Sequence, residues 1–254
     1  MKILMLAGNG ESSLFIYNAL KKKYIIDKVI IEDKVPTKKL IRSRIKKLGF
    51  FKVTNQLIFQ LTISKFLKIS SSKRIKELKK KYSFSSHIIK DSVLIKVSSV
   101  NDNECIIAIK KINPDIIIVN GTRIISTKVL DSTSAIFINT HVGITPQYRG
   151  VHGGYWSLVC NDEKNCGVTI HKVDKGVDTG DIIYQNIITI TKQDNFSTYP
   201  YLQYGVAIPL IKSALNDIIN NNLRTFKKDN LKSNLYYHPT ILGYLYNRIF
   251  NGIK

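Results

Sequence analysis

Short apolar runs alternate with helical patterns along the chain, and this alternation limits the fold more than any other feature. The runs contain few polar residues, which is typical of strands buried on both faces of a parallel sheet. The expected strands cover residues 2–7, 28–32, 93–100, 116–120, 135–139, 167–173 and 181–190. Because helical stretches lie between most of them, the sequence predicts an α/β fold with a mainly parallel sheet and helices on both faces.

A second feature is the division of the 254 residues into a main part and an appendage. We expect one domain at residues 1–200, interrupted by a basic helical insertion at about 34–82. Residues 201–254 are expected to form a C-terminal helix followed by an aromatic-rich extension. Those aromatic side chains need a surface to pack on, so the extension should be docked.

The insertion also carries most of the net charge. Sixteen Lys and Arg residues and one acid, Glu77, lie between Lys34 and Lys81, so this segment holds +15 of the net +21. Three interpretations of this segment remain open. It could be a solvated Lys-rich helix face, a site that attracts an anionic substrate, or a patch that touches a membrane surface. Nucleic acid is not expected, because no basic-aromatic or zinc motif accompanies the charge.

The apolar runs and the cysteines bear on where the protein works. No run reaches the roughly 18 apolar residues of a membrane span, and the first residues lack a signal-peptide cleavage site. Three scattered cysteines, Cys105, Cys160 and Cys166, form no disulfide framework. This usage suits a reducing compartment, so we expect a cytoplasmic protein.

Polar residues end one of the expected strands. Asn139 and His141 close an apolar run and lead directly into a loop rich in Gly, Pro, Arg and Tyr. Ligands in parallel α/β sheets bind beyond the carboxyl ends of strands, and buried His and Asn side chains need hydrogen-bond partners. An Asp that orients an imidazole makes an acid–base pair, and an Asn beside it can hold a carbonyl oxygen. Asp178, in the loop 173–181, is the candidate Asp.

Other patterns leave alternatives open. The turn GNGESS at 8–13 lacks the Lys of a P-loop, and Ser13 replaces the last Gly of the dinucleotide fingerprint, although Glu32 could bind a ribose. Backbone N–H groups in such a turn can also attract a phosphate or carboxylate, or the turn can simply need glycine. The five histidines form no metal pattern, so no metal is expected, and His87 and His238 are expected at the surface or in packing.

Several motifs in order resemble the catalytic core of the formyltransferases that use N10-formyltetrahydrofolate. They are Asn-Thr-His at 139–141, Pro-Gln-Tyr-Arg-Gly at 146–150, GVTIHKVDKGVDTGDII at 167–183 and NGTRII at 120–125. The resemblance covers roughly residues 1–10 and 83–200 and is weak elsewhere. It implies a Rossmann-like sheet and a folate-dependent transferase that moves a formyl group.

The resemblance also implies roles for particular residues. The catalytic trio would be Asn139, His141 and Asp178. Folate would contact Gly121, Thr122, Arg123, Ile124, Val173, Asp174 and Gly176. The acceptor would contact Gly10, Glu11, Ser12, Tyr148 and Arg149.

The acceptor implied by the resemblance is a nucleotide-linked amino sugar. A compact core with an insertion and a short extension is most similar to the sugar N-formyltransferases of bacterial surface-polysaccharide (lipopolysaccharide) synthesis. The members that act on methionyl-tRNA carry a further β-barrel, and those that act on glycinamide ribonucleotide lack the insertion, yet both acceptors stay open. A non-catalytic nucleotide-binding α/β protein is the other alternative. A homodimer and peripheral membrane contact through the basic segment are also considered.

Overall fold

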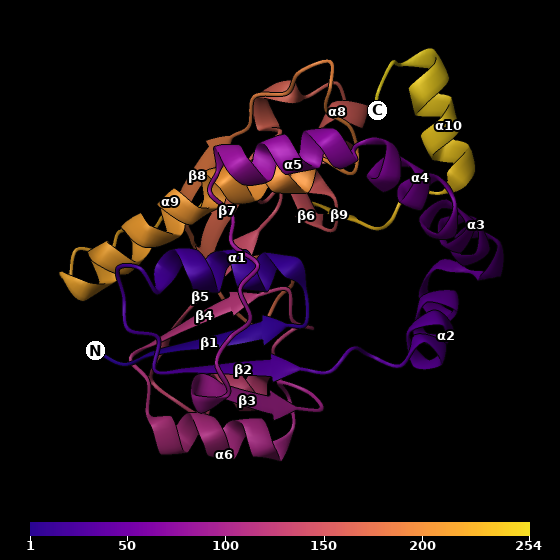
Figure 1. Ribbon diagram of the computed structural model, residues 1–254. Coiled ribbons are helices and arrows are strands. Elements are labelled where there is room, and N and C mark those ends of the chain that lie inside the picture. The colour runs from indigo at the N-terminus through magenta and orange to yellow at the C-terminus, as the bar shows by residue number, and fades with distance from the viewer.

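Seven strands form the central sheet in the order β3–β2–β1–β4–β5–β7–β8 (Figure 1). The structure is a computed structural model that describes residues 1–254. The strands of this sheet are β1 (Ile3–Gly8), β2 (Lys28–Glu32), β3 (Leu94–Val97), β4 (Ile116–Asn120), β5 (Ile136–His141), β7 (Gly167–Lys172) and β8 (Ile182–Ile187). A separate parallel pair joins β6 (Tyr148–Gly150) to β9 (Asn234–Tyr236).

The helices are distributed along the whole chain. They are α1 (Glu11–Leu20), α2 (Thr37–Leu48), α3 (Phe50–Leu61), α4 (Ile63–Ser70), α5 (Ser72–Lys81), α6 (Asn103–Ile112), α7 (Thr127–Leu130), α8 (Gly153–Val159), α9 (Tyr199–Ile219) and α10 (Ile241–Phe250), with 3-10 turns at Asp91–Val93 and Glu163–Asn165. Strands therefore form in all of the expected regions, and four helices lie within residues 34–82.

The pairing of the strands confirms the predicted α/β fold. Strands β3, β2, β1, β4 and β5 are parallel, whereas β7 runs antiparallel to β5 and β8 antiparallel to β7. The antiparallel hairpin places His171 directly opposite Asn139 on β5. All five parallel strands end at the same edge, so the loops after β1, β4 and β5 meet there.

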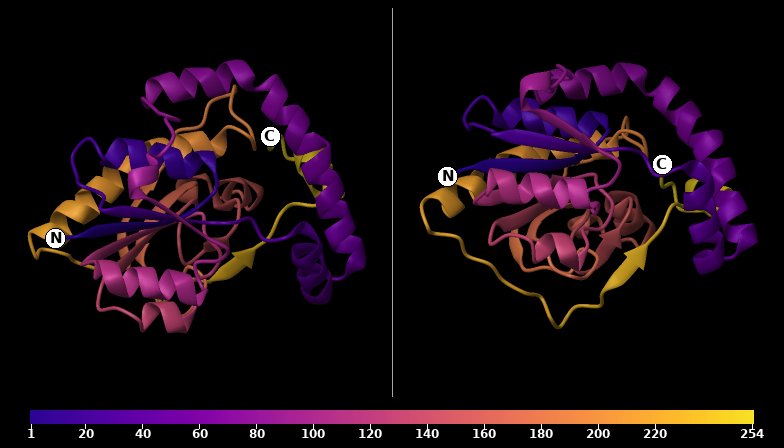
Figure 2. Two further views of the ribbon diagram at one scale, coloured as in Figure 1. Left: turned by 60° about the horizontal axis from the view of Figure 1, so that its bottom comes forward. Right: turned by 90° about the horizontal axis from the view of Figure 1, so that it is seen from below.

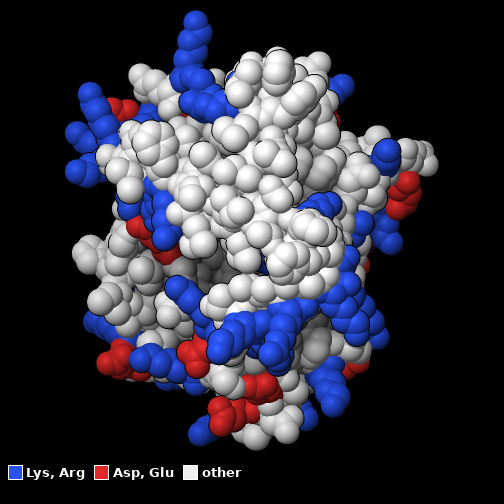
Figure 3. All heavy atoms as spheres, turned by 90° about the vertical axis from the view of Figure 1, so that its right-hand side faces the viewer, with Lys and Arg blue, Asp and Glu red and all other residues white.

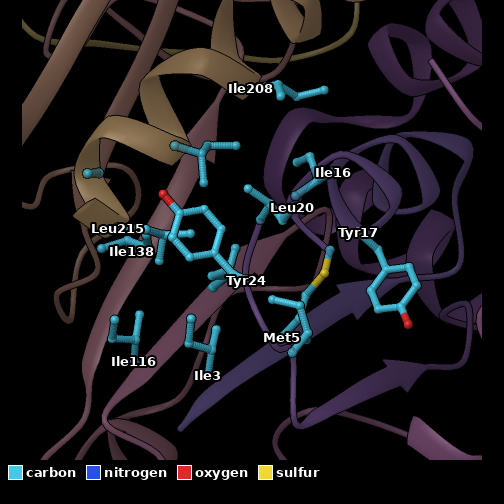
Figure 4. Close-up of a cluster of buried hydrophobic side chains, with 14 of the residues drawn as sticks. Ile3, Met5, Ile16, Tyr17, Leu20, Tyr24, Ile116, Ile138, Ile208 and Leu215 are labelled. Atoms are coloured by element: carbon cyan, nitrogen blue, oxygen red, sulfur yellow. The ribbon is translucent and has the colours of Figure 1, made fainter. Parts of the chain in front are cut away.

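Two apolar layers cover the two faces of the sheet. Alternate residues of β1 point to opposite sides, so Met5 lies in one cluster and Leu6 in the other. The first cluster joins the sheet to α1 and α9, with Leu20 and Leu215 among its members (Figure 4). The second joins it to α6. Because both faces are buried, the strands can be apolar along their whole length.

The insertion wraps around one side of the molecule as four helices, α2 to α5 (Figures 1 and 2). Phe59 of α3 and Leu78 of α5 are fully buried in a third cluster, which also contains Tyr244 of α10. The rings of Phe59 and Tyr244 lie 5.0 Å apart. The insertion and the C-terminal extension therefore pack on each other. None of the helices combines the length and apolar content needed to cross a membrane.

The expected boundary at residue 200 falls at the start of α9. This helix packs against β7, β8 and α1, so its apolar side is part of the main core. Beyond it, the chain returns to pair β9 with β6 and then forms α10. The last fifty residues thus contact the main domain in several places.

Candidate active site

A cavity of about 540 Å³ lies at the carboxyl edge of the sheet. Side chains from the ends of β4 and β5 line it, together with the loop that joins β7 to β8. It brings together all ten residues expected in the catalytic trio and the folate site: Asn139, His141, Asp178, Gly121, Thr122, Arg123, Ile124, Val173, Asp174 and Gly176. Residues far apart in sequence therefore share one space.

His141 and Asp178 face each other in this cavity. The Nδ1 atom of His141 lies 3.4 Å from Oδ2 of Asp178, and its Nε2 donates to the carbonyl of Tyr148 at 2.7 Å. Because a carbonyl only accepts, Nε2 carries the hydrogen and Nδ1 is the nitrogen that can exchange a proton beside the carboxylate. Burial lowers the pKa of His141, although the nearby Asp178 opposes this shift.

The loop around Asp178 holds its carboxylate in an ionised form. Asp178 adopts the left-handed region with φ of 52°, which is strained for a residue other than glycine. Burial would raise the pKa of Asp178, but the neighbouring His141 and His171 rings and the Gly150 N–H lower it to about 2. The Gly150 N–H donates to Oδ2 at 3.0 Å. Asp178 is thus an anion at neutral pH.

His171 orients Asn139 from the neighbouring strand. Its Nδ1 lies 2.6 Å from the carbonyl of Lys172 and therefore carries a hydrogen, so its Nε2 can accept from the Asn139 amide at 3.1 Å. One N–H of Asn139 is then used and the other is available to a ligand. The sequence alone does not mark His171 as a site residue, because its position beside Asn139 depends on the antiparallel pairing of β5 with β7.

The insertion and the C-terminal extension form the opposite wall of the cavity. Arg44 and Lys47 of α2 line it, as do Gln56 of α3 and residues 235–238. Lys47 also lies over the ring of Tyr237, with Nζ 5.3 Å from the ring centroid. This wall brings two cations to a cavity whose other side carries the acid–base pair.

A chain of hydrogen bonds runs from α2 through the C-terminal extension to His152, which precedes α8. Arg44 donates to Nε2 of His238 at 2.9 Å, and His238 Nδ1 lies 2.9 Å from His152 Nε2. Since Arg44 can only donate, His238 must be neutral and donate onward to His152. Burial lowers the pKa of His238 to about 4 and that of His152 to about 3. His238, expected at the surface or in packing, therefore lines the cavity.

A second cavity of about 320 Å³ adjoins the first, and Tyr204 lines both. Its other walls include Glu11 and Ser12 of α1 together with Ser64 and Lys68 of α4. The carboxylate of Glu11 accepts from Lys79 and from the Tyr201 hydroxyl. The insertion thus contributes to both cavities.

Three of the residues expected to contact the acceptor line neither cavity. Gly10 precedes α1, and its N–H donates to the carbonyl of Gly8. Tyr148 is buried and donates its hydroxyl to Asp162 at 2.8 Å. Arg149 donates to the carbonyl of Val177 at 2.9 Å and so braces the loop that carries Asp178. All three residues therefore make contacts within the protein, outside the lining of the cavities.

Glu32 does not fit the ribose role that the sequence left open. Its side chain is buried and accepts from the backbone N–H groups of Val100 and Arg123 at 3.1 and 2.6 Å. The guanidinium of Arg123 lies 2.7 Å from the same carboxylate. Both oxygens are therefore engaged within the protein, which argues against a dinucleotide at this position.

Comparison with known proteins identifies relatives of this chain. The family model described as formyl transferase matches residues 1–201. The methionyl-tRNA formyltransferase of Kosmotoga olearia is 33% identical over 165 residues, which are 61% of this chain and 52% of that protein. Matches to proteins of this kind span about a third to a half of their length.

Solved structures share the fold at lower sequence identity. A sugar N-formyltransferase from Shewanella sp. superposes with a TM-score of 0.57 at 16% identity, over 93% of this chain and 76% of that one. An N-formyltransferase from Helicobacter canadensis, solved in complex with folinic acid and dTDP-3-aminofucose, gives 0.53 at 22% identity, over 93% and 71%. The Rossmann-like formyltransferase fold is thereby confirmed.

Proposed function

Because the chain belongs to the formyl transferase family, we propose that it transfers a formyl group from N10-formyltetrahydrofolate to the amine of a nucleotide-linked amino sugar. The observation that carries this proposal is the convergence of Asn139, His141 and Asp178 on one cavity. The loops 121–124 and 173–176 line the same cavity and would hold the folate. Val119, Ile125 and Val173 supply apolar lining that fits a flat heterocycle.

Each member of the trio has a distinct task in this proposal. Bound N10-formyltetrahydrofolate supplies an activated formyl group. The free N–H of Asn139 donates to the formyl oxygen as it gains negative charge, a contribution worth about 3 to 4 kcal/mol in related chemistry. His141 Nδ1 accepts the proton that the attacking amine loses and returns it to N10, while ionised Asp178 stabilises the imidazolium. The new amide bond forms as the bond from carbon to N10 breaks.

The basic insertion supports an anionic acceptor. Arg44 and Lys47 lie on the first cavity, and Lys68 lies on the second. A nucleoside diphosphate would find cations there, and cavities of a few hundred Å³ suit a ligand of that size. The ligand bound by the Helicobacter canadensis protein, dTDP-3-aminofucose, belongs to this class. The reaction would then belong to surface-polysaccharide synthesis, and the three free cysteines favour a cytoplasmic setting.

A second candidate acceptor is methionyl-tRNA. Relatives that match by sequence include methionyl-tRNA formyltransferases, and the basic segment would favour a polyanion of any size. Binding of tRNA through phosphate contacts would weaken steeply with salt. An amino sugar held inside a cavity should depend on salt much less.

The test is a formyl-transfer assay with N10-formyltetrahydrofolate. The acceptors are a panel of nucleotide-linked amino sugars, initiator methionyl-tRNA and glycinamide ribonucleotide, and His141→Ala is assayed beside His87→Ala. We expect turnover of an amino sugar that the first substitution abolishes and the second, at an exposed histidine, preserves. Turnover of methionyl-tRNA alone would identify methionyl-tRNA, and not an amino sugar, as the acceptor. Absence of both turnover and folate binding would refute the proposal.

A further inference from the structure

The outer surface of the insertion and of α10 carries many large, exposed apolar side chains. Ten side chains form this apolar face, and each is 42 to 83% exposed. They are Phe50, Phe51, Ile58 and Leu61 of α3, Phe66 and Ile69 of α4, and Leu242, Tyr246, Ile249 and Phe250 of α10. A soluble monomer rarely leaves so many large apolar side chains together in water, so this face is expected to have a partner.

The helical spacing shows that the exposure is systematic. On α10, the four exposed residues follow the i, i+4, i+7, i+8 pattern of one helix face, whereas Tyr244 is buried on the opposite side. On α3, Val53 and Phe59 are buried, and Phe51 and Ile58 point the other way. Both helices therefore carry one apolar side that packs and a second that faces solvent.

The apolar stripes belong to a single surface. Helix α10 packs on α3, and α3 on α4, and Figures 1 and 2 show these helices along one edge of the molecule. That edge lies on the outside of the wall that closes the larger cavity. Of these helices, α3 lines the larger cavity through Gln56 and α4 lines the smaller one through Ser64 and Lys68, whereas their outer sides face solvent.

The charge around the apolar face has one sign. Residues 34–76 and 237–254 contain no Asp or Glu, whereas they contain fifteen Lys and Arg residues. Lys52 of α3, Lys65 of α4 and Arg248 of α10 are exposed. Figure 3 shows Lys and Arg gathered below an extended area of uncharged atoms on this side. An anionic, partly apolar partner would complement both properties.

We propose that the apolar face docks the protein on the surface of an anionic lipid bilayer. Exposed Phe, Leu and Ile side chains flanked by Lys and Arg are the pattern of helices that lie in a membrane interface. A second copy of the chain fits less well, because a two-fold interface would set basic residues against basic residues with no acid between them. Docking would place α2 and α3, and with them one wall of the cavity, against the membrane.

The experiment is co-sedimentation of the full chain with vesicles. Vesicles of phosphatidylcholine with 30% phosphatidylglycerol are compared with pure phosphatidylcholine, at low and high salt. We expect at least tenfold more binding to the anionic vesicles, a loss of most of it at high salt, and at least a tenfold decrease in the variant Phe51→Ser/Phe66→Ser/Phe250→Ser.

A matched control removes exposed isoleucines from other parts of the surface. Ile25, Ile88 and Ile107 are 65 to 86% exposed, and the variant Ile25→Ser/Ile88→Ser/Ile107→Ser should bind vesicles like the wild type. Circular dichroism confirms that both variants are folded. Equal binding to both vesicle types, or equal loss in both variants, would overturn the proposal. Self-association in sedimentation equilibrium that the Phe substitutions abolish would instead assign the face to a second copy.

Discussion

The two walls of the larger cavity differ in origin and in chemistry. One wall is built from the ends of β4 and β5 and the loop after β7, and it carries the acid–base pair and the carboxamide. The other is built from the insertion and the chain after residue 234, and it carries cations, Gln56 and aromatic rings. In the proposed reaction, the first wall would then determine the reaction type and the second wall the choice of acceptor.

The largest effect is expected at the first wall. His141→Ala and Asp178→Asn should each reduce kcat by about a thousandfold, because general acid–base catalysis contributes on this scale. Single-turnover formyl transfer measures the effect. Folate binding should persist in both variants, since the loops at 121–124 and 173–176 are unchanged. If substitution of Lys47 decreased kcat by the same factor, the two walls would not differ in function as proposed.

The next effect concerns the packing of the second wall. Phe59→Ala should lower the free energy of unfolding by about 3 kcal/mol or more, because the ring is fully buried against Tyr244 and Phe196. Phe51→Ala, on the same helix but 83% exposed, should change it by less than about 0.5 kcal/mol. Urea denaturation measures both. Similar changes in the free energy of unfolding for the two variants would mean that the buried side of α3 does not hold the helix in place.

A smaller effect is expected from the hydrogen-bond chain that links Arg44, His238 and His152. The pKa values of His238 and His152 lie at about 4 and about 3, below the usual 6.5, so the unfolded chain binds more protons between these values. Stability should therefore be constant above about pH 6.5 and fall as the pH decreases below it, by up to about 1.4 kcal/mol per pH unit for each group. Arg44 is the cation facing the pair, and Phe196 packs on His152.

His238→Asn tests this chain of hydrogen bonds. The variant should show a shallower decrease in the free energy of unfolding between pH 6.5 and 4, because one of the two suppressed protonations is absent. His87→Asn, at an exposed position, should leave the slope unchanged. An unchanged slope in His238→Asn would mean that other groups set the pH dependence.

The smallest effect is expected from a single cation of the second wall. Lys47→Gln should raise KM for an anionic acceptor by about threefold to tenfold at low salt and by less at high salt, while kcat stays the same. Lys39→Gln lies on the same helix and outside both cavities, so it serves as the control. Equal changes in both variants would assign the effect to overall charge.

The sequence was informative where local pattern decides the structure. The apolar runs that became β1, β2 and β4 need no distant partner to be recognised, and the motif residues Asn139 and Asp178 follow from their neighbours along the chain. His171 could not be selected, because it meets Asn139 only through an antiparallel pairing across strands. Tyr148 was assigned to the acceptor, but a partner in the chain, Asp162, takes its hydroxyl.

The second wall was even less accessible to sequence reasoning. Strand β9 has three residues and no alternating pattern, and its pairing with β6 joins positions more than eighty residues apart. His238 approaches Arg44 only because of this pairing and the packing of α3 on α10. Such contacts depend on tertiary packing, which a local pattern does not encode.

The pairing of β9 with β6 has a consequence for the order in which the site is completed during synthesis. The N-terminus of a chain leaves the ribosome first. The trio and the loops proposed to bind folate therefore emerge well before residues 235–238, which line the same cavity. A nascent chain can therefore form the sheet and its acid–base pair while the cavity is still open on one side. Only when β9 has joined β6 do residues 235–238 close that side, so an incomplete chain holds the acid–base pair without the enclosed cavity.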